Sequence, residues 1–295
     1  VFTSEMDPAV FRAAKTYWFK SAPGHEGIHG LGTGPFIDGK SQCLVGSACT
    51  LEIVNTDGSL AKRLPVFWGP CRLIRILEGP EGSHDAMIAQ WLNGTDELSL
   101  INSRDLTVRR GFYAVPAGHT MVGGWSAQNR VDLLWQDINA DGAPELVTAV
   151  NGTWNRVSTY DRQGKPLHNA QFGPGPGNTF RAYLRDLKTA PWGAAGRQVI
   201  LTATHENLVV ALDHECRRLW SRALPSAPRR LLVGGTNGRR LLVGCDDGTL
   251  VVLDDQGALQ ATAKVAGRVE HLLGLADGQV IVADASGALS RLSLP

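Results

Sequence analysis

A short acidic segment near the middle of the chain carries the residues best suited to hold a metal ion. Asp137, Asn139 and Asp141 alternate along it, and Glu145 follows Gly142 by three residues. Oxygen-bearing side chains at alternate positions can converge on one hard cation, and Ca²⁺ takes about six to eight oxygen ligands. The segment therefore predicts a structural Ca²⁺ site, with a backbone carbonyl and water completing the shell. The alternative is a metal-free turn in which Asp and Asn bond their own backbone.

A second group of residues is rich in aromatic, basic and amide side chains. These residues stand in or beside Gly- and Pro-rich segments between apolar runs, and loops on a rigid scaffold often carry function. A flat aromatic ring stacks on a sugar, while Arg, Asn and His bond hydroxyls or a carboxylate. The pattern predicts carbohydrate binding, and the alternative for each Trp is packing between sheets. The predicted ligand-binding residues are His29, Trp68, Trp125, Trp154, Asn155, Arg156, Phe172 and Arg181.

Four residues are candidates for acid–base chemistry. His119 lies in a Gly-rich segment near Arg110 and Tyr113, and an imidazole suits proton abstraction near neutral pH. His25 is a further candidate base, and it forms with His29 a pair at metal-compatible spacing for which the sequence fixes no third ligand. The predicted catalytic set is therefore His119, Tyr113, His25 and Arg110.

Composition and motifs exclude several classes of function. The 295 residues carry a net charge of +1, whereas a nucleic-acid-binding domain is usually more basic. No apolar run approaches the ~18 residues of a membrane span. The sequence has no Gly-x-Gly-x-x-Gly dinucleotide motif and no Gly-x-Ser-x-Gly nucleophile motif. It therefore predicts neither nucleic acid nor a membrane as a partner, and its 43% of hydrophobic residues allow a packed core.

The elements that must position these residues follow from a repeat. In each copy, two apolar runs flank a short polar turn, and Gly, Asn or Asp at the turns makes the pair a β-hairpin. One more strand before each hairpin and one after it would give four strands every ~40–50 residues, the period of a propeller blade. The sequence therefore predicts an all-β fold, a β-propeller of four-stranded antiparallel blades. Six copies are visible, and the first five end on Asn55, Asn102, Asp161, Asp213 and Asp254.

Two of the repeats resemble known propeller families. Residues 137–145, Asp-Ile-Asn-Ala-Asp-Gly-Ala-Pro-Glu, match the Asp-x-Asn-x-Asp-Gly-x-x-Glu/Asp loop of FG-GAP/VCBS propellers. Residues 245–254, Cys-Asp-Asp-Gly-Thr-Leu-Val-Val-Leu-Asp, resemble a PQQ-like blade. The chain is thus similar, over residues 26–295, to an FG-GAP/VCBS-type propeller with PQQ-like later blades. Residues 1–25 would form an N-terminal segment with a short helix, and the likeness is more specific for fold than for function.

Blade geometry predicts which residues meet. In a four-stranded blade, the turn between the second and third strands shares one end with the connections between blades. We name this end the first face and the opposite end the second face. The acidic loop belongs to the second face, while the predicted ligand-binding and catalytic residues gather on the first face.

The residues, the open last repeat and the resemblance together give three alternative functions. The first is an extracellular carbohydrate-binding propeller, secreted or periplasmic, that is part of a polysaccharide-processing protein and binds a polysaccharide or oligosaccharide. The second is a polysaccharide lyase, in which an arginine neutralises a uronate carboxylate and a base such as His119 starts β-elimination. The third is a protein-interaction scaffold, one subunit of a larger secreted assembly.

The chain ends and the cysteines add further expectations. The sixth copy ends at Pro295 after its third apolar run. Its outer strand is expected from residues 1–4, or else further blades come from a missing N-terminal part or a second chain. Cys43 and Cys49 flank a short turn and can pair across a hairpin. Cys216 and Cys245 are expected to be buried thiols.

Overall fold

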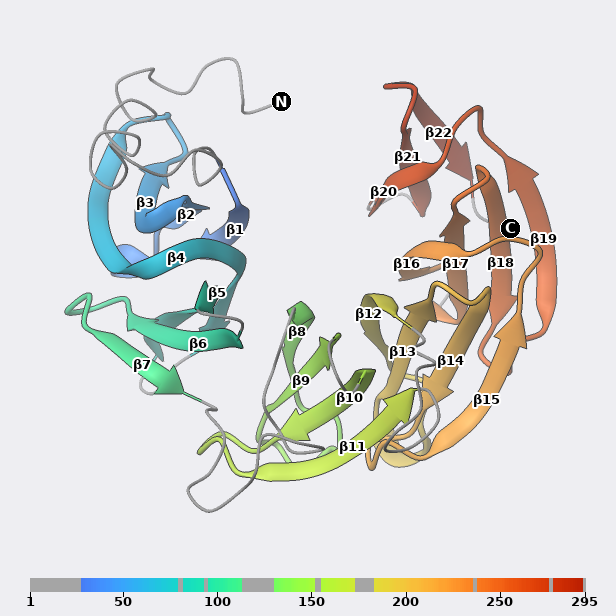
Figure 1. The fold of residues 1–295 in the computed structure, drawn as a ribbon, viewed down its shortest axis with the longest axis horizontal. Helices are drawn as coiled ribbons and strands as arrows, with labels where there is room; N and C mark the ends of the chain where they lie inside the picture. The colour runs from blue at the N-terminus through green and yellow to red at the C-terminus, as the bar shows by residue number, and fades with distance from the viewer. Residues whose placement is uncertain are drawn as a thin grey trace. The chain divides into compact units, whose positions relative to one another are not determined.

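The computed structural model describes residues 28–78, 82–92, 95–112, 130–151, 155–172, 183–235, 238–275 and 278–293. The regular elements in these ranges are strands, apart from two short 3₁₀ turns at Ile37–Gly39 and Ala194–Gly196. The strands form two compact units, β1–β7 in the N-terminal unit and β8–β22 in the C-terminal unit (Figure 1). Among the described residues, no helix is both long and apolar enough to cross a membrane.

The N-terminal unit is one antiparallel sheet in chain order, in which a long strand serves two blades. Blade 1 comprises β1 (Gly30–Pro35), β2 (Ser41–Gly46), β3 (Ala48–Asn55) and the first part of β4 (Leu60–Glu78). Blade 2 comprises the rest of β4 with β5 (His84–Leu92), β6 (Thr95–Asn102) and β7 (Val108–Phe112). Residues 67–70 were predicted as a loop between blades. They belong instead to β4, because the extended backbone runs on without a turn and Pro70 still pairs with Ala48.

The C-terminal unit contains four more blades, each with its strands in chain order. Blade 3 is β8 (Arg130–Gln136), β9 (Glu145–Val150), β10 (Asn155–Tyr160) and β11 (Pro166–Phe172), and blade 4 is β12 (Leu184–Ala190), β13 (Val199–Thr204), β14 (Leu208–Leu212) and β15 (Arg218–Ala223). Blade 5 is β16 (Pro228–Gly234), β17 (Arg240–Cys245), β18 (Thr249–Asp254) and β19 (Leu259–Lys264), and blade 6 is β20 (Val269–Gly274), β21 (Gln279–Asp284) and β22 (Leu289–Ser293). Within this unit the first strands lie on the inner side and the fourth strands on the outer side (Figure 1).

A small residue at one repeat position lets neighbouring blades approach. An added Cβ at Gly244 would lie 2.4 Å from Cγ1 of Val269, and one at Gly46 would lie 2.6 Å from the carbonyl oxygen of Cys71. Val269 and Cys71 both belong to the first strand of the following blade, so a larger side chain would push the two blades apart. The second strands of the six blades carry at this position Gly46, Ala89, Ala149, Ala203, Gly244 and Ala283.

One Asp builds the turn between the third and fourth strands of blades 3, 4 and 5. Oδ1 of Asp161, Asp213 and Asp254 accepts hydrogen bonds from the N–H groups two and four residues later, at 2.8–3.0 Å. The residue three positions later has a positive φ, which is 60° at Cys216 and 77° at Gly257. In these three blades, the regular Asp spacing seen in the sequence is therefore one Asx turn per blade.

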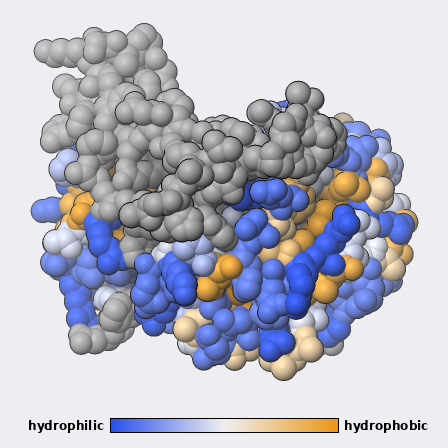
Figure 2. Space-filling view, turned by 60° about the horizontal axis from the view of Figure 1, so that its bottom comes forward, coloured by the Kyte–Doolittle hydropathy of each residue, from blue (hydrophilic) through white to orange (hydrophobic). Residues whose placement is uncertain are grey.

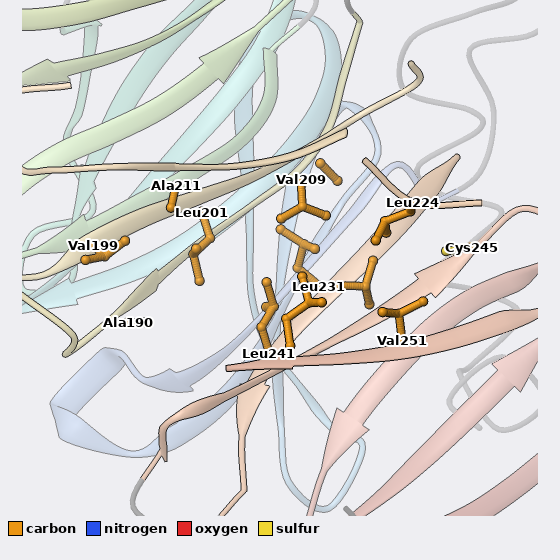
Figure 3. Packing of buried hydrophobic residues seen from close by; sticks show 13 residues of the cluster. Ala190, Val199, Leu201, Val209, Ala211, Leu224, Leu231, Leu241, Cys245 and Val251 are labelled. Atoms are coloured by element: carbon orange, nitrogen blue, oxygen red, sulfur yellow. The ribbon is translucent and has the colours of Figure 1, made fainter. Parts of the chain in front are cut away.

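The hydrophobic core lies between successive blades. Figure 3 shows the cluster between blades 4 and 5, where Leu201 and Val209 pack with Leu231 and Leu241. All four side chains are at most 2% exposed, which explains the apolar runs of the inner strands. The outer strands are mostly exposed, and Figure 2 shows apolar residues on one face as separate patches among hydrophilic ones.

Indole N–H groups also join blades 4 and 5 on the second face. Trp192 Nε1 donates to the carbonyl oxygen of Gly238 at 2.7 Å, and Trp220 Nε1 donates to that of Asp255 at 3.0 Å. Both acceptors stand in turns of blade 5, while both tryptophans belong to blade 4.

The cysteines differ in part from expectation. Cys43 has a free thiol, so the predicted hairpin disulfide is wrong. The register of β2 and β3 pairs Cys43 with Val54 and Gly46 with Leu51, which leaves Cys49 close to the turn and not opposite Cys43. Cys216 and Cys245 are buried as predicted, and burial raises the pKa of each thiol to about 12.

Candidate functional site

The acidic loop is a hydrogen-bonded turn between β8 and β9. Asp137 Oδ1 accepts the N–H of Ala140 at 2.7 Å, and Asn139 Oδ1 accepts the N–H of Asp141 at 2.8 Å. The Asn139 side-chain amide donates to Asp141 Oδ2 and to Glu145 Oε1, each at 3.0 Å. The amide nitrogen therefore lies between the two carboxylates.

Each carboxylate of the loop also accepts hydrogen bonds from backbone N–H groups of the same loop. Burial is the main cause that raises the pKa of Glu145, and the nearby charges of Asp141 and Asp137 raise it further. The described ranges contain no group of three or more His, Cys, Asp or Glu side chains placed to hold a metal ion. Binding of Ca²⁺ to Asp137, Asn139, Asp141 and Glu145 would require the Asn139 amide to turn, and it stays a prediction.

Five predicted ligand-binding residues lie in the described ranges. His29 precedes β1, Trp68 lies within β4, and Phe172 is the last residue of β11. Asn155 and Arg156 were placed in a turn by the sequence, but they are the first residues of β10 and are only 2% and 3% exposed. β10 pairs with β9 and β11 on its two edges, and burial lowers the pKa of Arg156.

The other seven predicted residues are Arg110, which lies in a strand, and six residues outside the described ranges. Arg110 lies in β7, so the strand continues where a blade-to-blade connection was predicted to begin. The remaining six predicted residues lie outside the described ranges: His25, Tyr113, His119, Trp125, Trp154 and Arg181. Their gathering on the first face, and their roles in sugar binding or catalysis, stay predictions.

Two motif matches in the N-terminal region are not supported by their surroundings. Residues 34–41, Gly-Pro-Phe-Ile-Asp-Gly-Lys-Ser, have the spacing of a phosphate-binding loop, which requires a strand, a loop and a helix. Here they join two antiparallel strands, β1 and β2, around the fully buried Phe36. Residues 25–29, His-Glu-Gly-Ile-His, have the spacing of a zinc-protease motif, which needs both histidines on one helix. His29 is not helical, and residues 25–27 lie outside the described ranges.

A continuous run of charged side chains crosses blades 4, 5 and 6 on the first face. Arg185 Nη1 donates to Asp246 Oδ2 at 2.5 Å, and Arg229 Nη1 lies 3.8 Å from Asp246 Oδ1. Arg229 Nη2 also donates to Glu270 Oε2 at 2.8 Å, and Arg268 Nε donates to Glu270 Oε1 at 2.7 Å. We call these five residues the arginine ladder.

Three residues of the arginine ladder occupy the same position in successive repeats. Arg185, Arg229 and Glu270 are each the second residue of their first strand, β12, β16 and β20. Each is also the residue skipped by a register shift, so each forms a β-bulge. A bulge turns a side chain away from the regular pleat, and bulges are frequent beside functional sites. The bulges therefore aim these three charges at the first face.

The arginine ladder is partly open to solvent. The side chains of Arg185 and Arg229 are each 27% exposed, that of Glu270 is 23% exposed and that of Arg268 is 49% exposed. Hydrogen bonds from Arg268, and next from Arg229, hold the pKa of Glu270 below its usual value. Glu270 is thus ionised at neutral pH, and the ladder is accessible to a partner.

An aromatic pair with an exposed tyrosine stands beside the arginine ladder. Tyr183 is 44% exposed and comes two residues before Arg185. Its N–H donates to Nδ1 of His205 at 2.8 Å, and the two rings meet edge to face with centroids 5.2 Å apart. His205 and Asp246 occupy equivalent places, because the N–H of each bonds the carbonyl oxygen just before the first strand of its own blade.

This arrangement can bind a partner through charge-assisted hydrogen bonds and an aromatic contact. The sequence does not indicate the arginine ladder, because the unusual residues of this chain stand in loops, whereas the ladder residues stand at strand ends and in short turns. Arg185, Arg229 and Glu270 precede the small residue of the second strand by 18, 15 and 13 positions, so an alignment of the repeats on that small residue does not bring them together.

The comparisons with known proteins identify the fold. No family model matches the chain, and no curated protein is similar to it. A chain of the mitotic checkpoint complex shares 13% identity over 91% of this chain and 74% of its own, with a TM-score of 0.65. The Dos1 propeller shares 12% over 91% and 67%, with a TM-score of 0.66, and BamB from Moraxella catarrhalis shares 13% over 90% and 85%, with a TM-score of 0.51.

Identities this low show the fold alone. The FG-GAP/VCBS and PQQ-like types of the sequence-based resemblance therefore stay a resemblance. The four-stranded antiparallel blades and these likenesses together confirm the predicted architecture, and the chain has the all-β fold of a β-propeller.

Proposed function

We propose that this chain is a protein-interaction scaffold that binds a partner protein through the first face of blades 4–6. The observation that carries the proposal is the arginine ladder, in which bulges of three successive blades aim charged side chains at one accessible surface. Arg and Tyr are enriched at the centres of protein interfaces, and both residue types occur here. The likeness to a chain of the mitotic checkpoint complex, a multiprotein assembly by its name, supports the same class of function.

Carbohydrate binding is a second candidate. One observation favours it, which is that the exposed ring of Tyr183 stands beside Arg185, as a sugar acid would require. A lyase activity needs a base as well, and the bases predicted for it (His25, Tyr113 and His119) lie outside the described ranges. The protein-interaction proposal ranks first because all of its residues lie within the described ranges.

Site-specific photo-crosslinking tests the proposal. A photoreactive amino acid is introduced at Tyr183 on the first face, or at Arg239 on the second face as control, and an extract of the cells that make the chain is irradiated. We expect a discrete protein adduct from position 183 that Arg229→Glu removes, and no such adduct from position 239. Equal adducts at both positions, or an adduct insensitive to Arg229→Glu, would contradict the proposal. Binding on a glycan array that is lost in Tyr183→Ala would favour the second candidate.

A further inference from the structure

We infer that the arginine ladder is a receptor for carboxylate side chains, so that the partner presents an acidic segment to the first face. This inference rests on the proposed function and names the chemistry of the partner. It is carried by the charge balance of the arginine ladder, by the unused hydrogen-bond donors of its arginines and by the way the two signs of charge alternate.

Positive charge exceeds negative charge among the residues of the arginine ladder and Arg230. Arg230, the residue after Arg229, points its Nε at the carbonyl oxygen of Glu270, 2.6 Å away, and so it neutralises no carboxylate. Together with Arg185, Arg229 and Arg268 it makes four guanidinium groups, against the carboxylates of Asp246 and Glu270. The neighbouring Asp247 changes nothing in this balance because it pairs with Lys264 at 3.4 Å. Within this set two guanidinium groups are not matched by a carboxylate, while Glu206 and Asp284 add negative charge at the turn after β13 and at the end of β21.

The arginine ladder also has more hydrogen-bond donors than acceptors. A guanidinium has five N–H donors. Arg185 spends Nη1 on Asp246, and Arg229 spends Nε and Nη2 on a single oxygen of Glu270. Both oxygens of Glu270 are already engaged, one by Arg229 and one by Arg268. Asp246 Oδ1 is a ladder oxygen without a hydrogen bond, and the remaining N–H groups of Arg185 and Arg229 outnumber it within the described residues. A carboxylate can bind two such donors side by side.

The alternation of charge favours a protein over a nucleic acid. Asp246 and Glu270 lie between the arginines, so a continuous phosphate backbone would meet a negative charge at every second step. Nucleic-acid binding also draws on a broad positive field, and this chain has a net charge of only +1. An acidic peptide can space its carboxylates to meet the arginines, and it can place an apolar side chain against the exposed ring of Tyr183.

Fluorescence anisotropy with a defined probe tests the inference. The probe is a short fluorescein-labelled peptide of alternating Glu and Ser, and its controls are the same peptide with Gln for Glu and an oligo-dT strand. Arg229→Gln and Arg185→Gln are the test variants. Arg239→Gln is the matched control, because Arg239 is also paired with an aspartate, Asp255, but lies at the opposite end of blade 5. We expect binding of the Glu peptide to weaken about tenfold in each test variant and to stay unchanged in the control.

Chemical footprinting locates the bound peptide. Phenylglyoxal modifies accessible arginines, and mass spectrometry then reports the extent of reaction at each one. The Glu peptide should protect Arg185, Arg229 and Arg268 and leave Arg239 reactive. Equal binding of the Gln peptide, tighter binding of oligo-dT, or protection that spares all three arginines would overturn the inference.

The outcome is separable from that of the proposed function. If Arg229→Glu abolishes the crosslinked adduct but the Glu peptide does not bind, the first face is a protein-binding surface and its partner is not acidic. If the Glu peptide binds as expected but no adduct forms at position 183, the carboxylate receptor stands and the scaffold proposal fails.

Discussion

Asp137, Asn139, Asp141 and Glu145 show that the same four side chains can serve either a cation or a turn. In the structure the Asn139 amide donates to both Asp141 and Glu145, so a hydrogen-bond donor contacts the two carboxylates that a metal ion would bind. Burial and like charge at Glu145 decide between the metal-free turn and the metal site. Burial and like charges penalise the ionised carboxylate of Glu145 in the turn, and a divalent cation would remove that penalty.

Addition of Ca²⁺ is therefore expected to raise the thermal unfolding midpoint if the predicted site exists. At about a hundredfold excess over Kd the gain would be about 2.7 kcal/mol. Asp141→Asn should abolish the gain, whereas Asp161→Asn, the same substitution in another turn of blade 3, should keep it. Calorimetry with and without chelator measures the shift, and an unchanged midpoint in the native chain would show the Ca²⁺ prediction to be wrong.

The pH dependence of this gain has a definite sign. The pKa of Glu145 is raised, so this carboxyl takes up its proton at a higher pH than an ordinary glutamate does. Ca²⁺ binds the ionised form. Stabilisation by Ca²⁺ should therefore be complete above the raised pKa and disappear as the pH falls through it, earlier than it would for an exposed glutamate.

At the scale of elements, Gly257 shows how a turn and a neighbouring strand constrain one position together. Its φ of 77° disfavours any side chain, and an added Cβ would lie 2.8 Å from the ring of Trp220 on β15. Gly287 in blade 6 has a similar φ of 86°, but nothing lies within 4 Å of its added Cβ. The pair separates backbone strain from steric overlap within the same unit.

Both glycine-to-alanine variants are expected to lose stability, and by different amounts. Gly287→Ala should cost about 1–2 kcal/mol from left-handed backbone alone. Gly257→Ala should cost a further ~1–3 kcal/mol, because the methyl group must displace the indole ring. Urea unfolding of the two variants measures the difference. Equal losses would mean that Trp220 moves aside freely and that its bond to Asp255 does not fix it.

Strands and turns could be predicted from the sequence because their signals are local. Alternating apolar runs mark the inner strands, and Asp161, Asp213 and Asp254 mark turns that they build with their own neighbours. The bulges could not be predicted in this way. A bulge is a property of how two strands pair, so Arg185 looks in sequence like any polar residue near the start of a strand.

The continuous strand β4 is a second instance of this limit. Residues 67–70 contain Gly69 and Pro70, which usually indicate a turn. Pairing of Ala48 with Pro70 keeps the backbone extended there, and this pairing joins residues that are distant in the sequence. Asn155 and Arg156 likewise pair as strand residues with β9 and β11, where the sequence predicts a turn.

At the scale of the whole molecule, the repeat predicts the architecture but not the function. The six blades and their strand order follow from one pattern repeated along the chain. Function depends on which side chains from separate repeats meet on one face, and that depends on blade packing. This explains why the fold prediction is confirmed, whereas the arginine ladder became visible only in three dimensions.

Amide hydrogen exchange should rank the strands in the same order of protection in every blade of the C-terminal unit. The second and third strands of each complete blade pair on both sides, as β13 and β14 do, so their amides should exchange most slowly. The outer strands β15 and β19 pair on one side within their sheets, and every second amide should exchange quickly. Among the described residues β22 pairs with β21 alone, so it should behave like β15. Protection of β22 as strong as that of β21 would contradict this expectation, and it would show that a further strand, from residues 1–4 or from a second chain, completes blade 6.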